Sequence, residues 1–434
     1  MKRVQIAIIT AILGVLLVGQ CAANDELLKR YVNEALLQNL QIEMSRSDVE
    51  IARRDRDAAA SAFYPTAGFD YRHTRVNREI SLDIPLNIPG FEAGSVLSKS
   101  WQWQAAFSGR VPLYLGGRLR HNLGLRDAVL KGSEIGVDID ERDVALQVIQ
   151  GYLDLKMALA LEVVQGAALE TAKEHQRSVQ AMLDQGMVSL RELKRAEAVT
   201  AEAESELIAA GNAAQRARRA FNYVLNRDLE TEVDASAEPQ WGGEYDLAEA
   251  IEKAVQARPE LAALQQRLLA GNKQIDLARS DYYPNFSLAA EGGWRDGDIM
   301  AMGGRDYWQV SVLAGLTLFD ATREDKIAAA RASRRREGLL LESTRKRIEL
   351  QVTDSYLRLV DARKQLSASE REVSAAEEAQ RVAELQFEQG VVNQVTYLDA
   401  EFALISAGVR NEQARFKVWK AEAALRHAAG YPLP

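Results

Sequence analysis

The 434-residue sequence contains one cysteine, Cys21, and nine prolines, and only 7% of its residues are aromatic. A single cysteine excludes a disulfide bond or a cysteine-based zinc cluster within one chain. The small number of prolines and aromatics favours a mainly helical protein. The formal net charge is −8, which argues against a nucleic-acid partner because such partners bind basic surfaces.

The sequence also lacks the residue patterns of an enzyme active site. Its four histidines, His73, His121, His175 and His427, are scattered and do not have the spacing of metal ligands. Neither a glycine-rich phosphate-binding loop nor a nucleophile elbow is present. We therefore expect a protein that is not an enzyme and that has no catalytic residues, metal or cofactor.

Residues 1–23 have the pattern of a secretory signal peptide. Lys2 and Arg3 form a basic start, and the apolar segment from Ile6 to Val18 follows. This segment is too short for a typical membrane-spanning helix. Beyond it, no run of about 18 apolar residues occurs, so the sequence predicts no transmembrane helix in the mature chain.

The end of this segment leaves two interpretations open. Cys21 is followed by two alanines, which suits ordinary cleavage before Asn24. The alternative is lipid attachment at Cys21, because bacterial lipoproteins begin at such a cysteine. The residue before a lipidated cysteine is normally small, and here it is Gln20.

The main feature of the remaining chain is an internal duplication. Five residues of the stretch 147–155 recur with the same spacing in 351–359. Gln185-Gly186 recurs as Gln389-Gly390, and both matches have an offset of 204 residues. Several identities at one offset indicate that the fold is built from two repeats.

Each copy predicts one long helix, a tight turn and a returning helix, over residues 118–226 and 322–430. A helix of about 65 residues is about 100 Å long, which exceeds the thickness of any globular core. We therefore expect these helices to pack along their length, as in a coiled coil. Asn226 and Gly430 at their ends suit the left-handed backbone that often follows a helix.

The segments before the long helices also match. Tyr64-Pro65 corresponds to Tyr283-Pro284, and an alternating run follows each pair. A helix from Glu26 to about Ser61 should end there, since the residue before a proline disfavours helical backbone. The order in each repeat is helix, strand, strand, long helix, helix. The predicted divisions are a signal peptide at 1–23, a first repeat at 24–226, a linker at 227–245 and a second repeat at 246–430.

Four segments alternate apolar and polar residues with a period of two, which predicts strands. They are residues 66–76, 101–114, 285–294 and 307–319. Their lengths suit tilted strands that cross a bilayer, with tryptophan and tyrosine near the ends. A soluble half-buried sheet shows the same alternation. The signal peptide, the predicted lack of a transmembrane helix and two hydrophilic hairpin loops favour an outer-membrane barrel.

Four strands cannot close a barrel, because lipid does not tolerate an open sheet edge. Membrane barrels have at least eight strands. Several chains must therefore share one barrel. Two chains would supply eight strands and three would supply twelve, and the strand count alone leaves both open.

The pattern resembles the TolC-type outer-membrane efflux protein family over essentially residues 25–430. The resemblance lies in the two Tyr-Pro boundaries, the strand ends at 111–117 and 316–319, and the helix-turn stretches at 185–186 and 389–400. It implies a mainly α-helical fold with a membrane β-barrel portion. The implied assembly is a homotrimer in which a 12-stranded barrel stands on a long α-helical periplasmic tunnel.

The resemblance also implies a function in the outer membrane of a Gram-negative bacterium. The expected role is the exit duct of a tripartite efflux or type I secretion system. Its partners would be outer-membrane lipid, a periplasmic adaptor (membrane fusion) protein and, through the adaptor, an inner-membrane pump. From the residues alone, a second hypothesis is a periplasmic coiled-coil scaffold or binding module with a soluble sheet.

Two groups of residues are the candidate sites. By the resemblance, the helix turns form the periplasmic tip where the adaptor docks, and the gate lies just beyond the second turn. The docking candidates are Gly186, Met187, Val188, Gly390, Val391 and Val392. The gate candidates are Thr396 and Asp399, which share one helix face because they are three residues apart.

Asp399 matches an acidic position that lines the gate in many members of the family. The first repeat departs from this pattern, because Arg195 stands at the equivalent place. The alternative interpretation of Asp399 is a surface residue that pairs with a neighbouring arginine or lysine.

Overall fold

The computed structural model describes residues 26–82, 95–239, 241–297 and 305–433. The predicted signal peptide with Cys21 and parts of both predicted hairpin loops lie outside these residues. The chain divides into two compact units. The helical unit consists of Met1–Ser47, Ile135–Ala262 and Glu342–Pro434, and the sheet unit consists of Asp48–Glu134 and Ala263–Leu341. Each unit contains segments of both predicted repeats.

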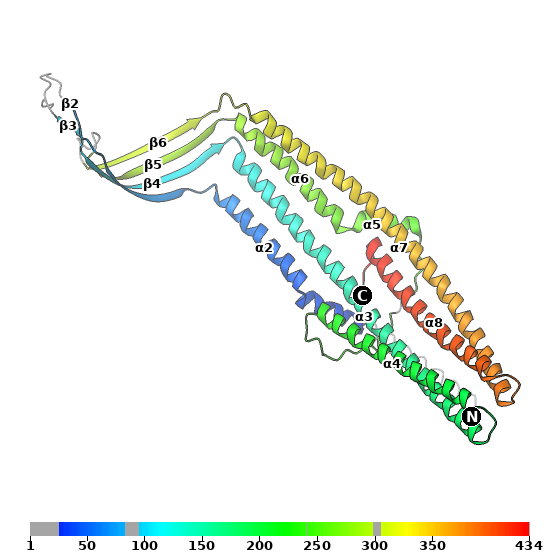
Figure 1. Ribbon diagram of the computed structural model, residues 1–434. Helices are drawn as coiled ribbons and strands as arrows, with labels where there is room; N and C mark the ends of the chain where they lie inside the picture. The colour runs from blue at the N-terminus through cyan, green and yellow to red at the C-terminus, as the bar shows by residue number, and fades with distance from the viewer. Residues whose placement is uncertain (1–25, 83–94, 240, 298–304, 434) are drawn as a thin grey trace, which may run out of the picture. The chain divides into compact units, whose positions relative to one another are not determined.

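Helices account for most of the chain (Figure 1). After a helical segment at residues 26–38, the helices are α2 (Leu40–Ser61), α3 (Arg118–Asp184), α4 (Leu190–Val224), α5 (Leu247–Ala257), α6 (Pro259–Arg279), the 3-10 helix η1 (Ser280–Tyr282), α7 (Arg323–Glu388) and α8 (Gln394–Ala429). The strands are β1 (Thr66–Arg75), β2 (Ile80–Leu82), β3 (Ser95–Ser98), β4 (Trp101–Leu115), β5 (Asn285–Asp296) and β6 (Asp306–Gly315).

The two predicted long helix hairpins are present. Helices α3 and α4 have 67 and 35 residues, and α7 and α8 have 66 and 36. This near equality fits the duplication found in the sequence. Asn226 and Gly430 follow the returning helices with φ of +53° and +76°, the left-handed conformation that their residue types predict.

The prediction of one helix from Glu26 to about Ser61 is wrong, because the helix is interrupted at Asn39. The Asn39 side chain accepts a hydrogen bond from the backbone N–H of Gln41 at 2.9 Å and so caps the start of α2. Its Nδ2 donates to the carbonyl oxygen of Val224 at 2.9 Å. The second repeat has a break at the corresponding place, where Arg258 precedes Pro259 and separates α5 from α6.

An aromatic group lies at the centre of the helical unit. The rings of Tyr31 and Phe221 meet edge to face at 5.2 Å, and both lie 6.0 Å from the ring of Tyr152. Val148 and Ile149 of α3 are fully buried beside them. Aromatic pairs at these separations add to the stabilisation that burial of their area provides.

Helix α3 differs from expectation in one respect. Among the described helices, it contains a window long and apolar enough to cross a membrane by length and composition, with a mean hydropathy of 1.3. The sequence had predicted no transmembrane helix, because it contains no uninterrupted apolar run of that length beyond residue 23. The window is 44% buried within the protein, which fits a helix that packs against several neighbours.

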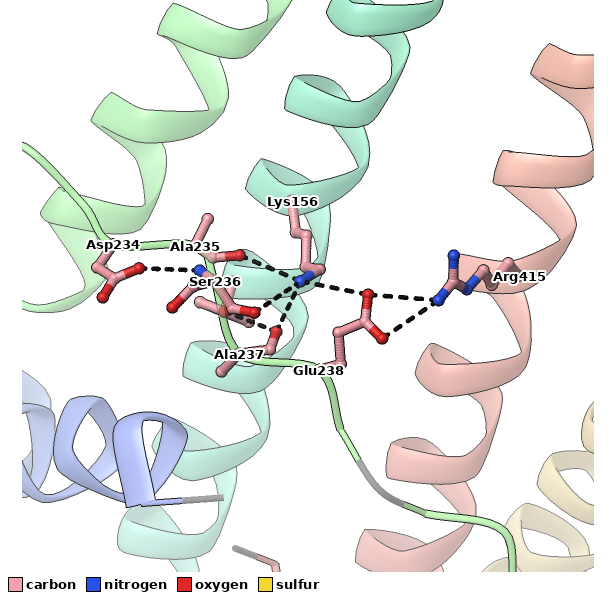
Figure 2. Close-up of polar contacts among 8 residues, drawn as sticks. Lys156, Asp234, Ala235, Ser236, Ala237, Glu238 and Arg415 are labelled. Carbon is pink, nitrogen blue, oxygen red and sulfur yellow. Dashed lines mark hydrogen bonds and ion pairs between the residues drawn. The ribbon is translucent and has the colours of Figure 1, made fainter. Parts of the chain in front are cut away.

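Over its described residues, 227–239 and 241–245, the linker has no helix or strand, yet it is firmly attached to α3. We call residues 234–238 the linker strap. Tyr152 donates its hydroxyl to the carbonyl oxygen of Ala237 at 2.8 Å, and Ala237 is buried. Lys156 donates from Nζ to the carbonyl oxygens of Ala235, Ser236 and Ala237 at 3.2, 3.3 and 2.9 Å (Figure 2).

The strap also reaches the second hairpin. Glu238 lies 3.7 Å from the Lys156 ammonium, and it accepts hydrogen bonds from Arg415 of α8 at 3.2 and 3.3 Å (Figure 2). Segments from both repeats are therefore connected through one short stretch of extended chain.

The sheet unit contains a four-stranded antiparallel sheet in the order β1-β4-β5-β6. Its register places most apolar residues of the four strands on one face, with Leu313 of β6 as an exception on the other. Phe69 lies opposite Phe107, which lies opposite Gly292, which lies opposite Trp308. This face is exposed, with Phe107 60% and Trp308 82% accessible.

The other face of the sheet is polar. Gln104 donates to Glu291 at 3.1 Å and to the Tyr307 hydroxyl at 2.7 Å. The alternation of apolar and polar residues therefore separates two faces, as the sequence predicts. Strands β2 and β3 form a separate short ladder inside the predicted loop 77–100, and no sequence pattern had indicated it.

The fourth strand is shorter than predicted. It was expected to span residues 307–319, but β6 ends at Gly315. Gly315 is paired with Asn285, the first residue of β5. The alternation continues to Phe319, but within the described chain no strand lies opposite residues 316–319 to continue the ladder.

Replacing Lys156 with methionine tests how much the strap contributes. The change keeps most of the side-chain volume and removes the donor to three carbonyl oxygens. Hydrogen bonds from a charged donor typically contribute 1.5–3 kcal/mol, so we expect about 2–3 kcal/mol less stability in denaturant unfolding. The matched control is Lys173→Met on the same helix, where an exposed ion pair with Glu170 should contribute at most about 0.5 kcal/mol. Equal effects would show that the strap contacts add little.

Candidate functional site at the hairpin tips

Both hairpin turns rest on a glycine with left-handed backbone. Gly186 has φ of +73° and Gly390 has φ of +68°. The backbone N–H of the next residue reaches back to the preceding helix in each turn: Met187 donates to Met182 at 2.9 Å, and Val391 donates to Gln386 at 2.8 Å. Glycine adopts this backbone with the least strain, so the duplicated Gln-Gly pair has a local structural cause.

The two turns meet in the helical unit and together line a groove of about 460 Å³, here called the tip groove. Its lining residues are Val179, Met182, Met187, Val188, Ser189, Glu192, Phe387, Gln389, Gly390, Val392, Asn393 and Gln394. Of the six docking candidates, four lie in this lining, and Gly186 and Val391 lie outside it. Met187 and Val391 are 69% and 68% exposed. The tips therefore present apolar side chains to the surroundings.

Behind the groove, three rings from three helices are stacked. His175 of α3 lies 4.7 Å from Tyr397 of α8, and Tyr397 lies 5.5 Å from Phe387 of α7. The Gln394 side chain lies at the same place, with Nε2 3.0 Å from Nε2 of His175 and donating to the carbonyl oxygen of Glu192 at 3.3 Å. We call these five residues the tip cluster. It joins α8 to both helices of the first hairpin.

Burial changes the acid–base properties of this region. It lowers the pKa of His175 to about 4, so the imidazole is neutral at physiological pH. The Gln394 amide can then donate to the unprotonated Nε2. Burial raises the pKa of Glu401, one turn further along α8, to about 6. This value also includes a hydrogen bond with Tyr397, which lowers the pKa, and the neighbouring Glu384 carboxylate, which raises it.

The gate candidates lie on the other side of α8 from the tip cluster. Thr396 and Asp399 are exposed, whereas Tyr397 and Leu398 are buried. The backbone N–H of Thr396 donates to Oδ1 of Asn393 at 3.0 Å, and this bond caps the start of α8. The Thr396 hydroxyl donates to the same oxygen at 3.2 Å, so this side chain has a local structural role that the sequence did not indicate.

Asp399 has an open environment. Within the described residues, no lysine, arginine or histidine nitrogen lies within 4.0 Å of its carboxylate. Among these residues, the suggested surface ion pair is therefore not formed. Arg195, its counterpart in the first repeat, is also exposed. Over the described ranges, no group of three or more acidic, histidine or cysteine side chains is positioned to hold a metal ion.

The sequence indicated the two turns but gave no sign of the tip cluster. His175 stands alone in a helical pattern, and Gln394 follows Asn393 as an ordinary first-turn residue. Neither carries a motif. Their importance arises because the two hairpins, more than 200 residues apart in the chain, bring them together.

Comparison with known proteins identifies a family. Residues 31–227 and 250–431 match the outer membrane efflux protein family. The two matched ranges end close to the predicted ends of the repeats, and together they cover most of the chain.

Individual relatives are more distant. Outer membrane protein OprJ of Pseudomonas aeruginosa is 27% identical over 150 residues, which are 34% of this chain and 31% of OprJ. The probable efflux pump outer membrane protein TtgC of Pseudomonas putida is 26% identical over 186 residues, covering 42% of this chain and 37% of TtgC. The aligned part thus spans about a third of the length of these curated relatives.

Solved structures share the fold over nearly the whole chain. The outer-membrane channel OprN superposes with a TM-score of 0.78 at 21% identity, and the match covers 94% of this chain and 91% of OprN. The mainly helical fold with long helices and a few strands, which the sequence predicts, is therefore confirmed.

The tip cluster predicts a pH effect on stability that depends on His175. Its folded pKa is depressed from 6.5 to about 4, so its contribution is present above pH 6.5 and is lost as the pH falls toward 4. A shift of this size corresponds to about 3 kcal/mol. In denaturant unfolding between pH 7.5 and 4, His175→Phe should lose less stability than the unmodified protein. His175→Gln should behave like His175→Phe, since neither replacement side chain titrates. Equal acid sensitivity of all three proteins would contradict the assignment of this pH effect to His175.

Proposed function

The chain belongs to the outer membrane efflux protein family, and we propose that it forms the outer-membrane exit duct of a tripartite efflux or type I secretion system. In this role it would accept substrates from an inner-membrane pump through a periplasmic adaptor and release them outside the cell. The relatives are efflux and channel proteins rather than enzymes. We propose no catalytic residues, metal or cofactor.

The exposed apolar face of the sheet is the observation that carries this proposal. In a soluble half-buried sheet, the apolar face would be covered by other elements. Here the aromatic and aliphatic side chains of four strands are exposed together, which suits contact with lipid. The polar face would line the interior. Together with the family membership, this favours the duct over a periplasmic scaffold with a soluble sheet.

The sheet edges support a shared barrel. Strands β1 and β6 are the outer strands, and in the described chain each pairs on one side only. Lipid does not tolerate unpaired backbone groups, so other chains must pair with both edges. We propose a homotrimer with twelve strands, in which the repeats 24–226 and 246–430 each supply two strands per chain. The mass of the detergent-solubilised particle tests this directly, because a monomer or a dimer contradicts it.

The location can be tested independently. An outer-membrane barrel should remain in the outer-membrane pellet after a high-salt wash, because apolar contact with lipid is insensitive to salt. A periplasmic scaffold attached by charged contacts would be released by the same wash.

The tip groove is the proposed docking surface for the adaptor. Support comes from its place at the two turns, from its mixed apolar and polar lining, and from the exposure of Met187 and Val391. Apolar side chains at a surface of this kind are typical of protein–protein contacts. Because each repeat supplies one turn, the adaptor would contact a docking surface made of two similar but not identical halves.

Replacing Gly390 tests the docking role. A Cβ at this position would meet nothing within 4 Å, so a substitution acts through the backbone angle and not through a clash. Gly390→Val should distort the turn, because a left-handed conformation costs a residue with a Cβ about 1–2 kcal/mol. We expect loss of export, measured as accumulation of a fluorescent efflux substrate in cells, while trimer and barrel remain intact.

Gly390→Asn is the matched control, since asparagine tolerates left-handed backbone better than other residues. It should retain most of the export. Normal export by Gly390→Val would show that this turn is not part of the docking surface. Crosslinking from Val391→Cys in cells should capture the adaptor directly.

Thr396 and Asp399 remain the proposed gate residues. Both are exposed, and Asp399 has no cation partner within the described chain. In a symmetric trimer, three copies of this carboxylate would surround one axis. Rings of carboxylates attract cations and favour their passage. The gate proposal therefore depends on trimer symmetry as well as on the side chain.

Single-channel recording in a planar bilayer tests the gate. The unmodified protein should show a small conductance with cation preference and block by divalent cations. Asp399→Ala should reduce both, because it removes one carboxylate from each chain of the ring. Glu377→Ala, which removes an exposed carboxylate from α7, is the control and should change neither. Unchanged selectivity and block in Asp399→Ala would place the constriction elsewhere.

A further inference from the structure

A second pocket lies within the helical unit, between α3, α4 and α8. Its volume is about 180 Å³, and we call it the three-helix pocket. Its lining residues are Gln165, Ala168, Ala172, Val199, Glu202, Ala203, Glu206, Glu401, Phe402 and Ile405. Most of these are apolar, and the ionisable ones are all glutamates. None of the tip groove residues belongs to it.

Glu401 gives this pocket an unbalanced charge. Glu401 is only 5% exposed. In the described chain, its Oε2 atom is buried and has no hydrogen-bond partner. Glu401 has a hydrogen bond with Tyr397, but this second oxygen is unsatisfied. An ionised carboxylate with an unsatisfied oxygen is costly to bury, because it loses its hydration. Native proteins rarely retain such an atom unless something satisfies it.

Two further carboxylates stand near Glu401. Glu202 and Glu206 are four residues apart on α4, so they lie on one helix face, and both are exposed. No lysine, arginine or histidine belongs to the pocket lining. The protein therefore supplies three potential negative charges here and no internal cation among the lining residues.

We propose that the three-helix pocket binds a small organic ammonium ion. The positive charge would complement the three glutamates, and the alanine, valine and isoleucine walls would contact its methyl or methylene groups. Phe402 adds an aromatic surface, on which a cation is attracted by the ring quadrupole. This site goes beyond the exit-duct function and does not depend on it.

The pocket's dimensions and chemistry narrow the ligand class. Pockets for drug-sized molecules typically enclose about 300–1,000 Å³, so this one fits a smaller ion. A dehydrated metal ion would need several converging oxygen ligands. Among the described residues, no group of three acidic, histidine or cysteine side chains has a metal-binding arrangement. An alkylammonium ion needs charge and apolar contact, and the pocket offers both.

The charge of Glu401 should control binding. Its pKa is raised to about 6: burial is the largest cause, a hydrogen bond with Tyr397 of α8 opposes it, and the carboxylate of Glu384 of α7 adds to it. The two α4 glutamates face it across the pocket, and His175 of α3 stacks on Tyr397. Glu401 is therefore mostly ionised at pH 7.5 and mostly protonated at pH 5. Affinity for a cation should fall over that interval.

Isothermal titration of the full-length protein in detergent tests the proposal, with choline as the probe. Its uncharged isostere, 3,3-dimethylbutan-1-ol, has the same shape without the positive charge. We expect choline to bind saturably, one per chain, and to bind at least about tenfold more tightly than the alcohol at pH 7.5. Choline should bind more weakly at pH 5. Equal binding of both probes, or no saturable binding of choline, would overturn the proposal.

Substitutions locate the site. Glu401→Gln should weaken choline binding about tenfold and abolish its pH dependence. The matched control, Glu370→Gln, removes an exposed carboxylate of α7 outside the pocket and should leave the affinity unchanged. If circular dichroism shows that Glu401→Gln does not fold, choline binding is measured with the double variant Glu202→Gln, Glu206→Gln instead. Both of these side chains are exposed, so their replacement should not affect folding. Undiminished affinity in the folded variant would refute the assignment.

Discussion

The unpaired edges of the four-stranded sheet impose the strongest constraint on this protein. The backbone groups on the outer sides of β1 and β6 need partners, and a lipid environment supplies none. The exposed apolar face does not suit a water-soluble sheet, in which other elements would cover that face. In the proposed barrel, strands of other copies would pair with both edges, and lipid would cover the apolar face. In the proposed trimer, the long helices of each chain would also have neighbours along their length, which is what helices of this length need for stability.

The duplication provides two hairpins of almost equal length whose chemistry has diverged. The turns keep the glycine, because both require the same left-handed backbone. The residues beyond the turns are free to differ, and Arg195 occupies the position in the first repeat that is equivalent to Asp399 in the second. The tip cluster is asymmetric as well, since His175 comes from the first hairpin while Gln394 and Tyr397 come from the second. Two hairpins with the same backbone but different side chains allow the two halves of the tip to make different contacts.

The sequence predicted those features that local physics determines. Periodicity located the hairpins and strands, and the glycine and asparagine positions gave the turns and helix ends. Prediction from the sequence failed where a segment that is distant in the chain determines the local structure. Asn39 interrupts a helical pattern because its side chain reaches Val224, and β6 ends at Gly315 because β5 offers no partner beyond Asn285. The tip cluster and the Glu401 pocket were invisible for the same reason. A lone histidine or glutamate within a helix acquires its character from the helices that bury it.

His175 and Glu401 also oppose each other in their response to acid. As the pH falls from 6.5 toward 4, the neutral His175 costs stability, since the unfolded chain takes up a proton more readily. Over part of the same range, Glu401 adds stability: its raised pKa favours the protonated folded form, and this benefit is lost only as the pH rises through about 6. Both groups contact Tyr397, so the compensation is local to the tip region. An ammonium ion in the three-helix pocket would hold Glu401 ionised and remove its part of the compensation. Acid would then act on the tip through His175 alone, which connects occupancy of the pocket to the stability of the contacts that join the two hairpins.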